Sequence, residues 1–126
     1  MIYGIGTDIV RVIRMQRNLD RYGDKFAARI LTANELEEFR RSGQPAHFLA
    51  RRFAAKEAAA KAFGTGFADG LALRHIGVTH DANGKPQLLF VGRAAELMAA
   101  CKIHTAHLSL ADEQDHAVAF VTLETN

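Results

Sequence analysis

The pattern of apolar and polar positions changes near residue 64 of the chain. Before that point, apolar residues recur every three to four positions, which predicts helices over residues 9–31, 32–43 and 45–63. After it, short apolar or alternating stretches predict strands over residues 76–79, 87–91, 107–111 and 117–123. One more strand is expected over residues 2–6, and one more helix over residues 93–102.

Capping residues divide the helical stretches. Gly23 marks a break in the first one, and Gly64 is a natural end for the last. In the segment TANE, the Thr32 hydroxyl is expected to accept from the Glu35 amide, and the Glu35 carboxylate is expected to accept from the Thr32 amide. This reciprocal pair of bonds is a capping box. Pro45 suits the first turn of the helix that follows.

The later strands are predicted to pair as hairpins. Asn83-Gly84 is a strong signal for a tight turn between two of them, and the polar segment 112–115 is expected to turn between the last two. The order is then strand, helices, hairpin, helix, hairpin. This order favours an α+β fold, with an antiparallel sheet packed against helices, over a parallel βαβ architecture. A length of 126 residues fits a single domain over residues 1–126.

The composition is that of a globular domain in water. Hydrophobic residues make up 48% of the chain and charged residues 24%, and no window approaches the ~20 apolar residues that a membrane span needs. The segment MIYGIGTDIV lacks the basic region and the long apolar run of a signal peptide. The single cysteine, Cys101, cannot form an internal disulfide. We therefore expect a cytoplasmic protein without membrane contacts.

Basic residues gather on one side of the first predicted helix. The net charge of +2 is too small to indicate nucleic-acid binding by itself. Helical spacing nevertheless places four basic side chains in one stripe: Arg14, Arg17, Arg21 and Lys25. Arginine favours carboxylates and phosphates, so this basic stripe fits an acidic protein or nucleic acid, unless it is an ordinary solvated face.

Two carboxylates are candidate metal ligands. Asp8 follows the first strand, where it is either the N-cap of a helix or a ligand held by a rigid strand end. Glu57, in the segment FAAKEAAAKAF, either forms an ordinary i,i+4 pair with Lys61 or faces a ligand that the surrounding alanines leave room for. Helical spacing puts Glu57 and Lys61 on one face, where together they can hold a divalent cation and a phosphate.

Two further observations bear on that site. The segment GTGFADG over residues 64–70 can offer backbone amides to phosphate, although it is neither a Walker A motif nor a dinucleotide fingerprint. The six histidines show no metal-binding spacing. Oxygen ligands from Asp8 and Glu57 suit Mg²⁺ better than Zn²⁺.

Taken together, the motifs resemble one enzyme family. The segments GIGTDIV at residues 4–10 and RRFAAKEAAAKAFGTG at residues 51–66 look like the opening and central motifs of the holo-acyl-carrier-protein synthases, the short bacterial type of 4′-phosphopantetheinyl transferase. NGKP at residues 83–86 and HLSLADEQDHAVAFV at residues 107–121 also agree. The resemblance therefore covers nearly the whole chain, and two long motifs in the right order are highly specific.

The resemblance implies a reaction and its partners. Such enzymes move 4′-phosphopantetheine from coenzyme A to a serine of acyl carrier protein, in fatty acid biosynthesis, and release adenosine 3′,5′-bisphosphate. The resemblance also implies the transferase fold, a homotrimer with active sites at subunit interfaces, and Mg²⁺ bound by Asp8 and Glu57. Members of the family bind the acidic carrier protein on their basic first helix, which corresponds to the basic stripe of this chain. Nucleic acid is not an expected partner on this interpretation.

Roles for further residues follow from this reaction. The carrier serine attacks the β-phosphate, and Mg²⁺ with an ammonium offsets the charge that accumulates on pyrophosphate oxygens. Lys61 is the expected ammonium; Lys56 is the weaker candidate, or only a surface lysine. Either Glu57 or a metal-bound water takes the serine proton. The expected contacts of coenzyme A are Gly64, Thr65 and Gly66 with the phosphopantetheine or its phosphates, and Asn83, Gly84, Lys85 and Pro86 near the adenosine.

The last predicted hairpin departs from the family pattern. Some members carry a Thr-His pair near the 3′-phosphate of coenzyme A, where this chain has Ala111 and Asp112. Because a carboxylate repels a phosphate, that role is not carried over, and Arg52 from a neighbouring subunit is our expectation for the contact. The rival interpretation of the chain is a non-catalytic module whose basic helix binds an acidic protein or nucleic acid. Such a module would tolerate the loss of Asp8 and Glu57.

Overall fold

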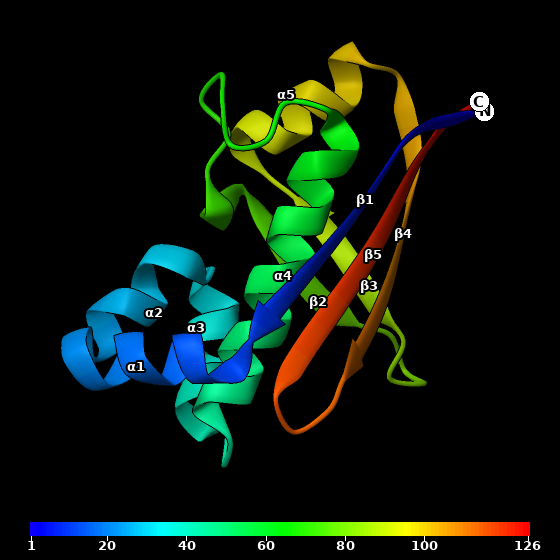
Figure 1. Ribbon diagram of the computed structural model, residues 1–126. Coiled ribbons are helices and arrows are strands. Elements are labelled where there is room, and N and C mark those ends of the chain that lie inside the picture. Colours follow the sequence, from blue (N-terminus) through cyan, green and yellow to red (C-terminus); the bar gives the residue numbers. More distant parts are fainter.

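A computed structural model describes residues 1–126 and has the α+β architecture that the sequence predicts (Figure 1). Its elements follow one another as β1 (Ile2–Arg11), α1 (Val12–Tyr22), α2 (Asp24–Ile30), α3 (Ala33–Arg41), α4 (Pro45–Phe63), the short 3₁₀ helix η1 (Leu73–His75), β2 (Ile76–His80), β3 (Pro86–Phe90), α5 (Gly92–Ala100), β4 (Ile103–Asp112) and β5 (His116–Thr125). None of the helices combines the length and the apolar character that crossing a membrane requires.

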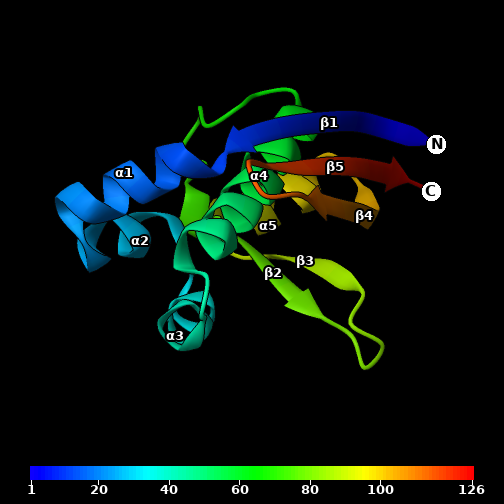
Figure 2. The same cartoon turned by 60° about the horizontal axis from the view of Figure 1, so that its bottom comes forward.

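The strands form two antiparallel sheets with helix α4 between them. One sheet has the order β1-β5-β4, and the other is the β2–β3 hairpin. Figure 2 shows α4 running between the two sheets, with α1, α2 and α3 together on one side. Because the first and last strands pair, the two termini lie side by side, and the Met1 ammonium donates to the Thr125 carbonyl at 2.7 Å.

The first strand is longer than the predicted residues 2–6. It continues to Arg11, and the first helix begins only at Val12. The cause is tertiary, since β1 pairs with β5 along its whole length. Apolar spacing after residue 8 fits a helix as well as the inner face of a strand, and the pairing decides between them. Asp8 therefore lies inside a strand, and its alternative role as a helix N-cap is wrong.

The local helix signals are confirmed. Gly23 separates α1 from α2 with a φ of 63°, and Gly64 ends α4 in the left-handed region with a φ of 86°. The Thr32 hydroxyl accepts from the Glu35 amide at 3.2 Å, and the Glu35 carboxylate accepts from the Thr32 amide at 2.9 Å, which completes the predicted capping box. Pro45 occupies the first turn of α4.

Both predicted hairpins are present. In the β2–β3 turn, the Asp81 carboxylate accepts from the amides of Asn83 at 2.8 Å and Lys85 at 2.9 Å, and Gly84 has a φ of 82°. Strands β4 and β5 both extend beyond their predicted bounds, because their pairing continues outside the alternating stretch of each.

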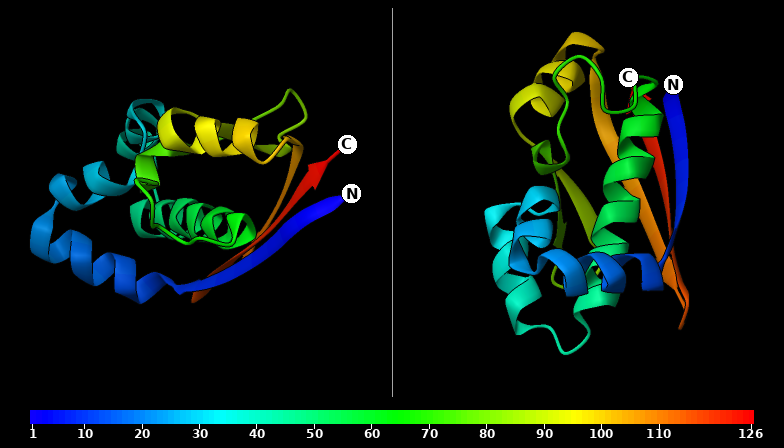
Figure 3. Two further views of the ribbon diagram at one scale, coloured as in Figure 1. Left: turned by 90° about the horizontal axis from the view of Figure 1, so that it is seen from above. Right: turned by 60° about the vertical axis from the view of Figure 1, so that its left-hand side comes forward.

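One face of the three-stranded sheet packs against α4, and the other face is uncovered. The inward residues of β5 are all buried: Ala117, Ala119, Val121 and Leu123. By contrast, the outward side chains of Ile5, Ile9 and Phe120 are 59%, 64% and 45% exposed. No helix lies over this outer face in the two views of Figure 3. We refer to these three residues and the strands around them as the outer sheet face.

Candidate active site

The opening and central motifs meet where β1 crosses α4. Gly4 and Gly6 lie on the inner face of β1, and a Cβ on either would come within 2.0 Å of a carbonyl oxygen of α4, that of Ala62 or Ala58. Only glycine allows the two backbones to lie this close. The alanines of α4 are buried against the rest of the chain. The expectation that they leave room for a ligand is therefore wrong, because they make room for the sheet.

Asp8 lies on the same face of β1, two positions after Gly6. The alternation of a strand thereby points its carboxylate toward α4. The Lys61 ammonium donates to Asp8 Oδ1 at 3.0 Å and to the Thr7 carbonyl at 2.9 Å. The side chain of Asp8 is 17% exposed and that of Lys61 is 51% exposed, so solvent reaches the pair from the lysine side. Lys61 thus bridges two elements and does not form the ordinary helical pair with Glu57.

Glu57 lies one turn before Lys61 on α4 and is half-buried. Burial raises the pKa of the Glu57 carboxyl, and the Asp8 carboxylate raises it further, while Lys61 and Arg14 oppose the shift. Burial is the larger cause of this shift, and the contribution of Asp8 indicates that the two carboxylates lie close enough to repel each other. Such a pair favours a divalent cation.

The donor atoms around Asp8 fit Mg²⁺. They are all oxygens, from the Asp8 and Glu57 carboxylates and the Thr7 carbonyl, and Asp8 and Thr7 both accept from the Lys61 ammonium. Mg²⁺ prefers oxygen ligands and usually binds through one or two carboxylates with waters and substrate phosphates. No cluster of three or more His, Cys, Asp or Glu side chains is present, so Mg²⁺ would depend on non-protein ligands as well.

Helix α1 reaches this site through an aromatic contact. The Arg14 guanidinium lies 5.3 Å from the centre of the Phe53 ring, one turn before Glu57 on α4. Stacking of a cation on a ring favours this placement. The charge of Arg14 also opposes the rise in the pKa of Glu57, which places the beginning of α1 within electrostatic reach of that carboxylate.

The remaining members of the basic stripe are exposed and lack acidic partners. Arg17 and Arg21 lie on α1, whereas Lys25 lies on α2, beyond the break at Gly23. The nearby carboxylates are engaged elsewhere: Asp20 accepts from Gln16, and Asp24 pairs with Arg40. The positive charge of the stripe is therefore available to a partner.

The two segments expected to contact coenzyme A lie far apart in the single chain. Gly64, Thr65 and Gly66 follow directly after the helical turn that carries Lys61, with Gly64 and Thr65 exposed. Residues 83–86 form the tip of the β2–β3 hairpin, on the opposite side of the molecule from residues 64–70, which we call the glycine loop (Figure 2). One chain alone therefore does not bring both segments to the same ligand.

The comparison with known families agrees with these motifs. A family model described as the 4′-phosphopantetheinyl transferase superfamily matches residues 4–121. The chain belongs to this superfamily. The resemblance seen in the opening and central motifs is thereby confirmed.

Relatives within the superfamily are similar over nearly their whole length. The chain is 58% identical over 125 residues to the holo-[acyl-carrier-protein] synthase of Halorhodospira halophila, with 99% of each chain covered. The crystal structure of the corresponding synthase from Neisseria meningitidis has a TM-score of 0.94 and 47% identity, with 99% of this chain and 100% of that one covered. A structure of the Bacillus anthracis synthase in complex with CoA (3′,5′-ADP) has a TM-score of 0.83 and 38% identity, covering 100% of this chain and 99% of that one.

In this superfamily member, the first lysine of the central motif is buried. Lys56 has no exposed surface, and its ammonium donates to Glu35 Oε1 at 2.7 Å, to the Leu73 carbonyl at 3.2 Å and to the Ile76 carbonyl. Its predicted roles as a surface lysine or a phosphate contact are therefore wrong. Sequence reasoning missed this network, although alanines on both sides of Lys56 indicated that this part of the helix is buried.

Arg52 is also drawn into the interior. It is 3% exposed, stacks on the Phe48 ring at 4.4 Å, and lies 3.6 Å from Glu35 and 3.4 Å from Glu38. Burial lowers the pKa of Arg52, and the two glutamates oppose the shift. The expected contact between Arg52 and the 3′-phosphate of coenzyme A therefore requires the guanidinium to leave these partners. Asp112, which stands where some members of the family have a histidine, pairs with Arg51 at 3.3 Å.

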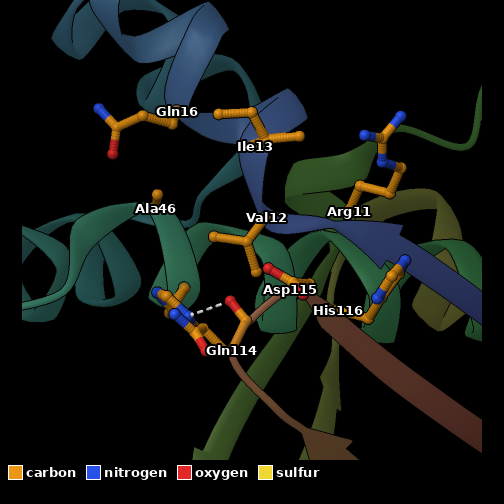
Figure 4. A pocket seen from close by; sticks show the side chains of 9 residues that line it. Arg11, Val12, Ile13, Gln16, Ala46, Gln114, Asp115 and His116 are labelled. Atoms are coloured by element: carbon orange, nitrogen blue, oxygen red, sulfur yellow. Dashed lines mark hydrogen bonds between the residues drawn. The ribbon is translucent and has the colours of Figure 1, made fainter.

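The largest surface hollow lies away from the carboxylates. It has a volume of about 590 Å³ and lies where the β4–β5 turn meets the beginnings of α1 and α4 (Figure 4). Its lining includes Gln114, whose carbonyl is 2.9 Å from His47 Nε2, and Asp115, whose carbonyl accepts from the Val12 amide at 2.9 Å. Neither Asp8, Glu57 nor Lys61 lines it. Its visible contacts hold the turn in place, and we assign it no chemistry.

Proposed function

We propose that the protein transfers 4′-phosphopantetheine from coenzyme A to a serine of apo acyl carrier protein, with Mg²⁺, in fatty acid biosynthesis. The observation that carries this proposal is the convergence of Asp8 from β1 with Glu57 and Lys61 from α4 at one partly open site. The names of the H. halophila and N. meningitidis relatives, and the ligand of the B. anthracis structure, support the same pair of substrates.

The reaction is a displacement at phosphorus. The serine oxygen bonds to the β-phosphorus while the bond to the bridging oxygen breaks, so adenosine 3′,5′-bisphosphate leaves with the electron pair. When bound by Asp8 and Glu57, Mg²⁺ supplies a Lewis acid for the pyrophosphate oxygens. Lys61 holds its ammonium at the same carboxylate and offers a second positive charge to those oxygens. Among the side chains of this chain, Glu57 is our candidate for accepting the serine proton.

The basic stripe is the proposed docking surface for the carrier protein. Arg14, at its near end, adjoins the carboxylates through Phe53, so a carrier bound along α1 presents its serine close to the metal ligands. Opposite charges on the two proteins speed their encounter and set the orientation of the complex.

We propose a homotrimer assembled through the outer sheet face. Ile5, Ile9 and Phe120 are large apolar side chains left exposed on this face, and their burial would stabilise an oligomer. An oligomer also accounts for the separation of the glycine loop from residues 83–86, which then contact one coenzyme A from neighbouring subunits. Sedimentation equilibrium is expected to give three times the 13.8 kDa of the chain, and Phe120→Asp the mass of one chain. A wild-type monomer at micromolar concentration would contradict the trimer.

Transfer is tested by intact mass spectrometry of apo acyl carrier protein after incubation with the protein, coenzyme A and Mg²⁺. The carrier should gain the mass of 4′-phosphopantetheine, and a chelator should abolish the gain. Asp8→Asn and Glu57→Gln should each lower the rate by at least about 100-fold, whereas Glu37→Gln, on the exposed surface of α3, serves as the control with an unchanged rate.

The same variants separate the transferase from a binding module. A module that works only through its basic helix would bind its acidic partner equally well with Asn at position 8 and Gln at position 57, and would leave the carrier mass unchanged. If the carrier stays unmodified under conditions where another holo-acyl-carrier-protein synthase modifies it, the proposed transferase activity is refuted. The cytoplasmic location expected from the sequence stays a prediction, which cell fractionation would test.

A further inference from the structure

Lys56 and Glu35 form a buried charged pair that no step of the proposed reaction uses. Lys56 has no exposed surface, and Glu35 is 1% exposed. Burial of two charges is tolerated only when their remaining polar atoms are bonded. The Lys56 ammonium meets this condition, because its three hydrogens have three acceptors: Glu35 Oε1 and the carbonyls of Leu73 and Ile76.

The two carbonyls lie at the far end of the glycine loop. Leu73 begins the 3₁₀ helix η1 and Ile76 follows it, 17 and 20 residues after Lys56. The end of α4 and the loop 64–70 lie between Lys56 and these carbonyls. The loop leaves α4 at Gly64, and Lys56 holds its other end against the same helix. Both ends of the loop are thus tied to α4, the near end by the chain itself and the far side by Lys56.

Glu35 extends this fixed region to two more elements. Its Oε2 accepts from the Val78 amide of β2 at 3.0 Å, and its Oε1 accepts from the Thr32 amide at the start of α3 at 2.9 Å. The carboxylate therefore ties α3 and β2 to α4 through Lys56. The glycine loop is anchored to a junction of three elements.

Lys56 and Glu57 are neighbours in sequence but point to different regions. Successive helical side chains are about 100° apart around the axis, which lets Glu57 face Asp8 while Lys56 faces η1. A rotation or slide of α4 would therefore displace both the carboxylate and the anchor of the loop. The two sites are coupled because they lie on consecutive residues of one helix.

We propose that Lys56 is a positioning residue, which holds the glycine loop 64–70 in register with Glu57 and Lys61 so that one coenzyme A pyrophosphate meets all three. The inference rests on the proposed function and describes how that same site is held. Two other bonds hold the loop, from the Gly66 amide to the Ala60 carbonyl at 3.2 Å and from Arg93 Nε to the Asp69 carbonyl at 2.9 Å, so loss of Lys56 loosens the loop without freeing it. Glycines lose more conformational freedom on ordering than other residues, so coenzyme A would then have to supply part of that ordering. Loss of the anchor should therefore weaken the use of coenzyme A and leave docking of the carrier on α1 unchanged.

The test compares the wild type with Lys56→Met, because Arg52 Nε, 3.6 Å from the Glu35 carboxylate, stays as its charged partner when the ammonium is removed. The amides of Thr32 and Val78 also stay bonded to Glu35, so the start of α3 and its contact with β2 are kept. Lys56→Met therefore leaves no buried charge without a partner and loses only the bonds of the ammonium. We expect its KM for coenzyme A to rise about tenfold, below the ~100-fold that a displacement of an ångström can cost, with an unchanged KM for the carrier. Hydrogen exchange should accelerate over residues 64–76 and not in β1 or β5.

A control and a second variant keep the test decisive. Val121→Ala lowers stability in the core of β5 without touching the loop, and it should leave both KM values unchanged. If Lys56→Met does not fold, Lys56→Gln is the second variant. Its amide can donate to the Glu35 carboxylate, its side chain is too short to bond both carbonyls, and it should give the same changes as Lys56→Met. Equal changes in the two KM values, or unchanged exchange over residues 64–76, would overturn the positioning role. Failure of the proposed function is seen separately, as an inactive wild type, because hydrogen exchange needs no turnover.

Discussion

Gly6→Ala is the sharpest test of how the fold builds the site. The added Cβ would lie 2.0 Å from the Ala58 carbonyl oxygen and 2.7 Å from the Ala62 amide nitrogen. Both atoms belong to the backbone of α4, so no side chain can rotate out of the way. Strand β1 and helix α4 must therefore move apart.

The size of the effect follows from the contact distance. Real Cβ atoms are essentially never closer than 3.0 Å to another heavy atom, so relief requires a separation of about 1 Å. Overpacking of this kind costs about 1–3 kcal/mol, which for a chain of this length lowers the Tm by about 4–12 °C. The same movement takes Asp8 away from Glu57 and Lys61. A misplacement of an ångström at a reacting site can lower kcat/KM by about 100-fold.

Gly43→Ala is the matched control. No atom lies within 4 Å of a Cβ at this position, and its φ is not positive, so alanine should leave stability unchanged or raise it by about 0.4–1 kcal/mol. Thermal unfolding gives the stability of both variants, and intact mass of the carrier gives their transfer rates. Titration with Mn²⁺ gives the affinity of the carboxylates for a divalent cation independently of turnover, and Gly6→Ala should weaken it.

One result would refute this reasoning. If Gly6→Ala unfolds at the same temperature as Gly43→Ala and transfers at the wild-type rate, the close approach of β1 and α4 does not set the geometry of the site. A lower Tm with an unchanged rate would separate stability from function and would leave the glycine as a packing residue alone.

Three further predictions concern individual charges. Lys61→Met should lower the transfer rate by about 100-fold, because it removes a charge that stabilises the transition state. In the absence of coenzyme A it should raise the affinity for Mn²⁺, measured by electron paramagnetic resonance, because the ammonium no longer competes for Asp8; a weaker affinity would contradict this competition. Arg17→Glu with Arg21→Glu should raise the KM for the carrier by more than about tenfold at low salt and leave the calorimetric Kd of coenzyme A unchanged, with Arg41→Glu on α3 as the control. Equal effects on both substrates would count against docking there. The amides of Lys85 and Asn83 hold the pKa of Asp81 in the folded protein below its ordinary value of 3.8, so the contribution of Asp81 to stability is present above pH 3.8 and is lost as the pH falls through the folded-state pKa. In acid unfolding, the wild type should therefore lose its stability advantage over Asp81→Asn only below about pH 4.

Local signals predict much of this fold because they act between residues that are close in sequence. The capping box of Thr32 and Glu35 and the break at Gly23 need only neighbouring residues, and both are confirmed. The length of β1 could not be predicted in this way. Its neighbour is β5, and the hydroxyl of Thr7 donates to a carbonyl 112 residues further along the chain. Only that pairing distinguishes a strand from a helix over the positions that follow Asp8.

The charged residues of the central motif show the same limit. Asp8 and Glu57 could be named as a pair because each belongs to a specific motif, and the structure places them together. The partner of Lys61 and the burial of Lys56 could not be named, because they depend on strand β1 and on Glu35 with the end of the glycine loop. From sequence alone, a lysine in an alanine-rich helix is interpreted as a solvated charge, and only the elements packed around that helix show that it is buried.

The two motifs form one structural device, since each lacks side chains where the other approaches. Glycines on alternate positions of β1 remove the Cβ atoms that would meet α4, and alanines at helical spacing keep the facing side of α4 flat. The first inward residue after the glycines is Asp8, so the alternation that brings the backbones together also delivers a carboxylate to the helix. On the helix, Glu57 and Lys61 are one turn apart and meet that carboxylate from the other side. The small residues therefore carry no chemistry themselves, yet they set the distance between the two carboxylates that we propose as ligands of Mg²⁺.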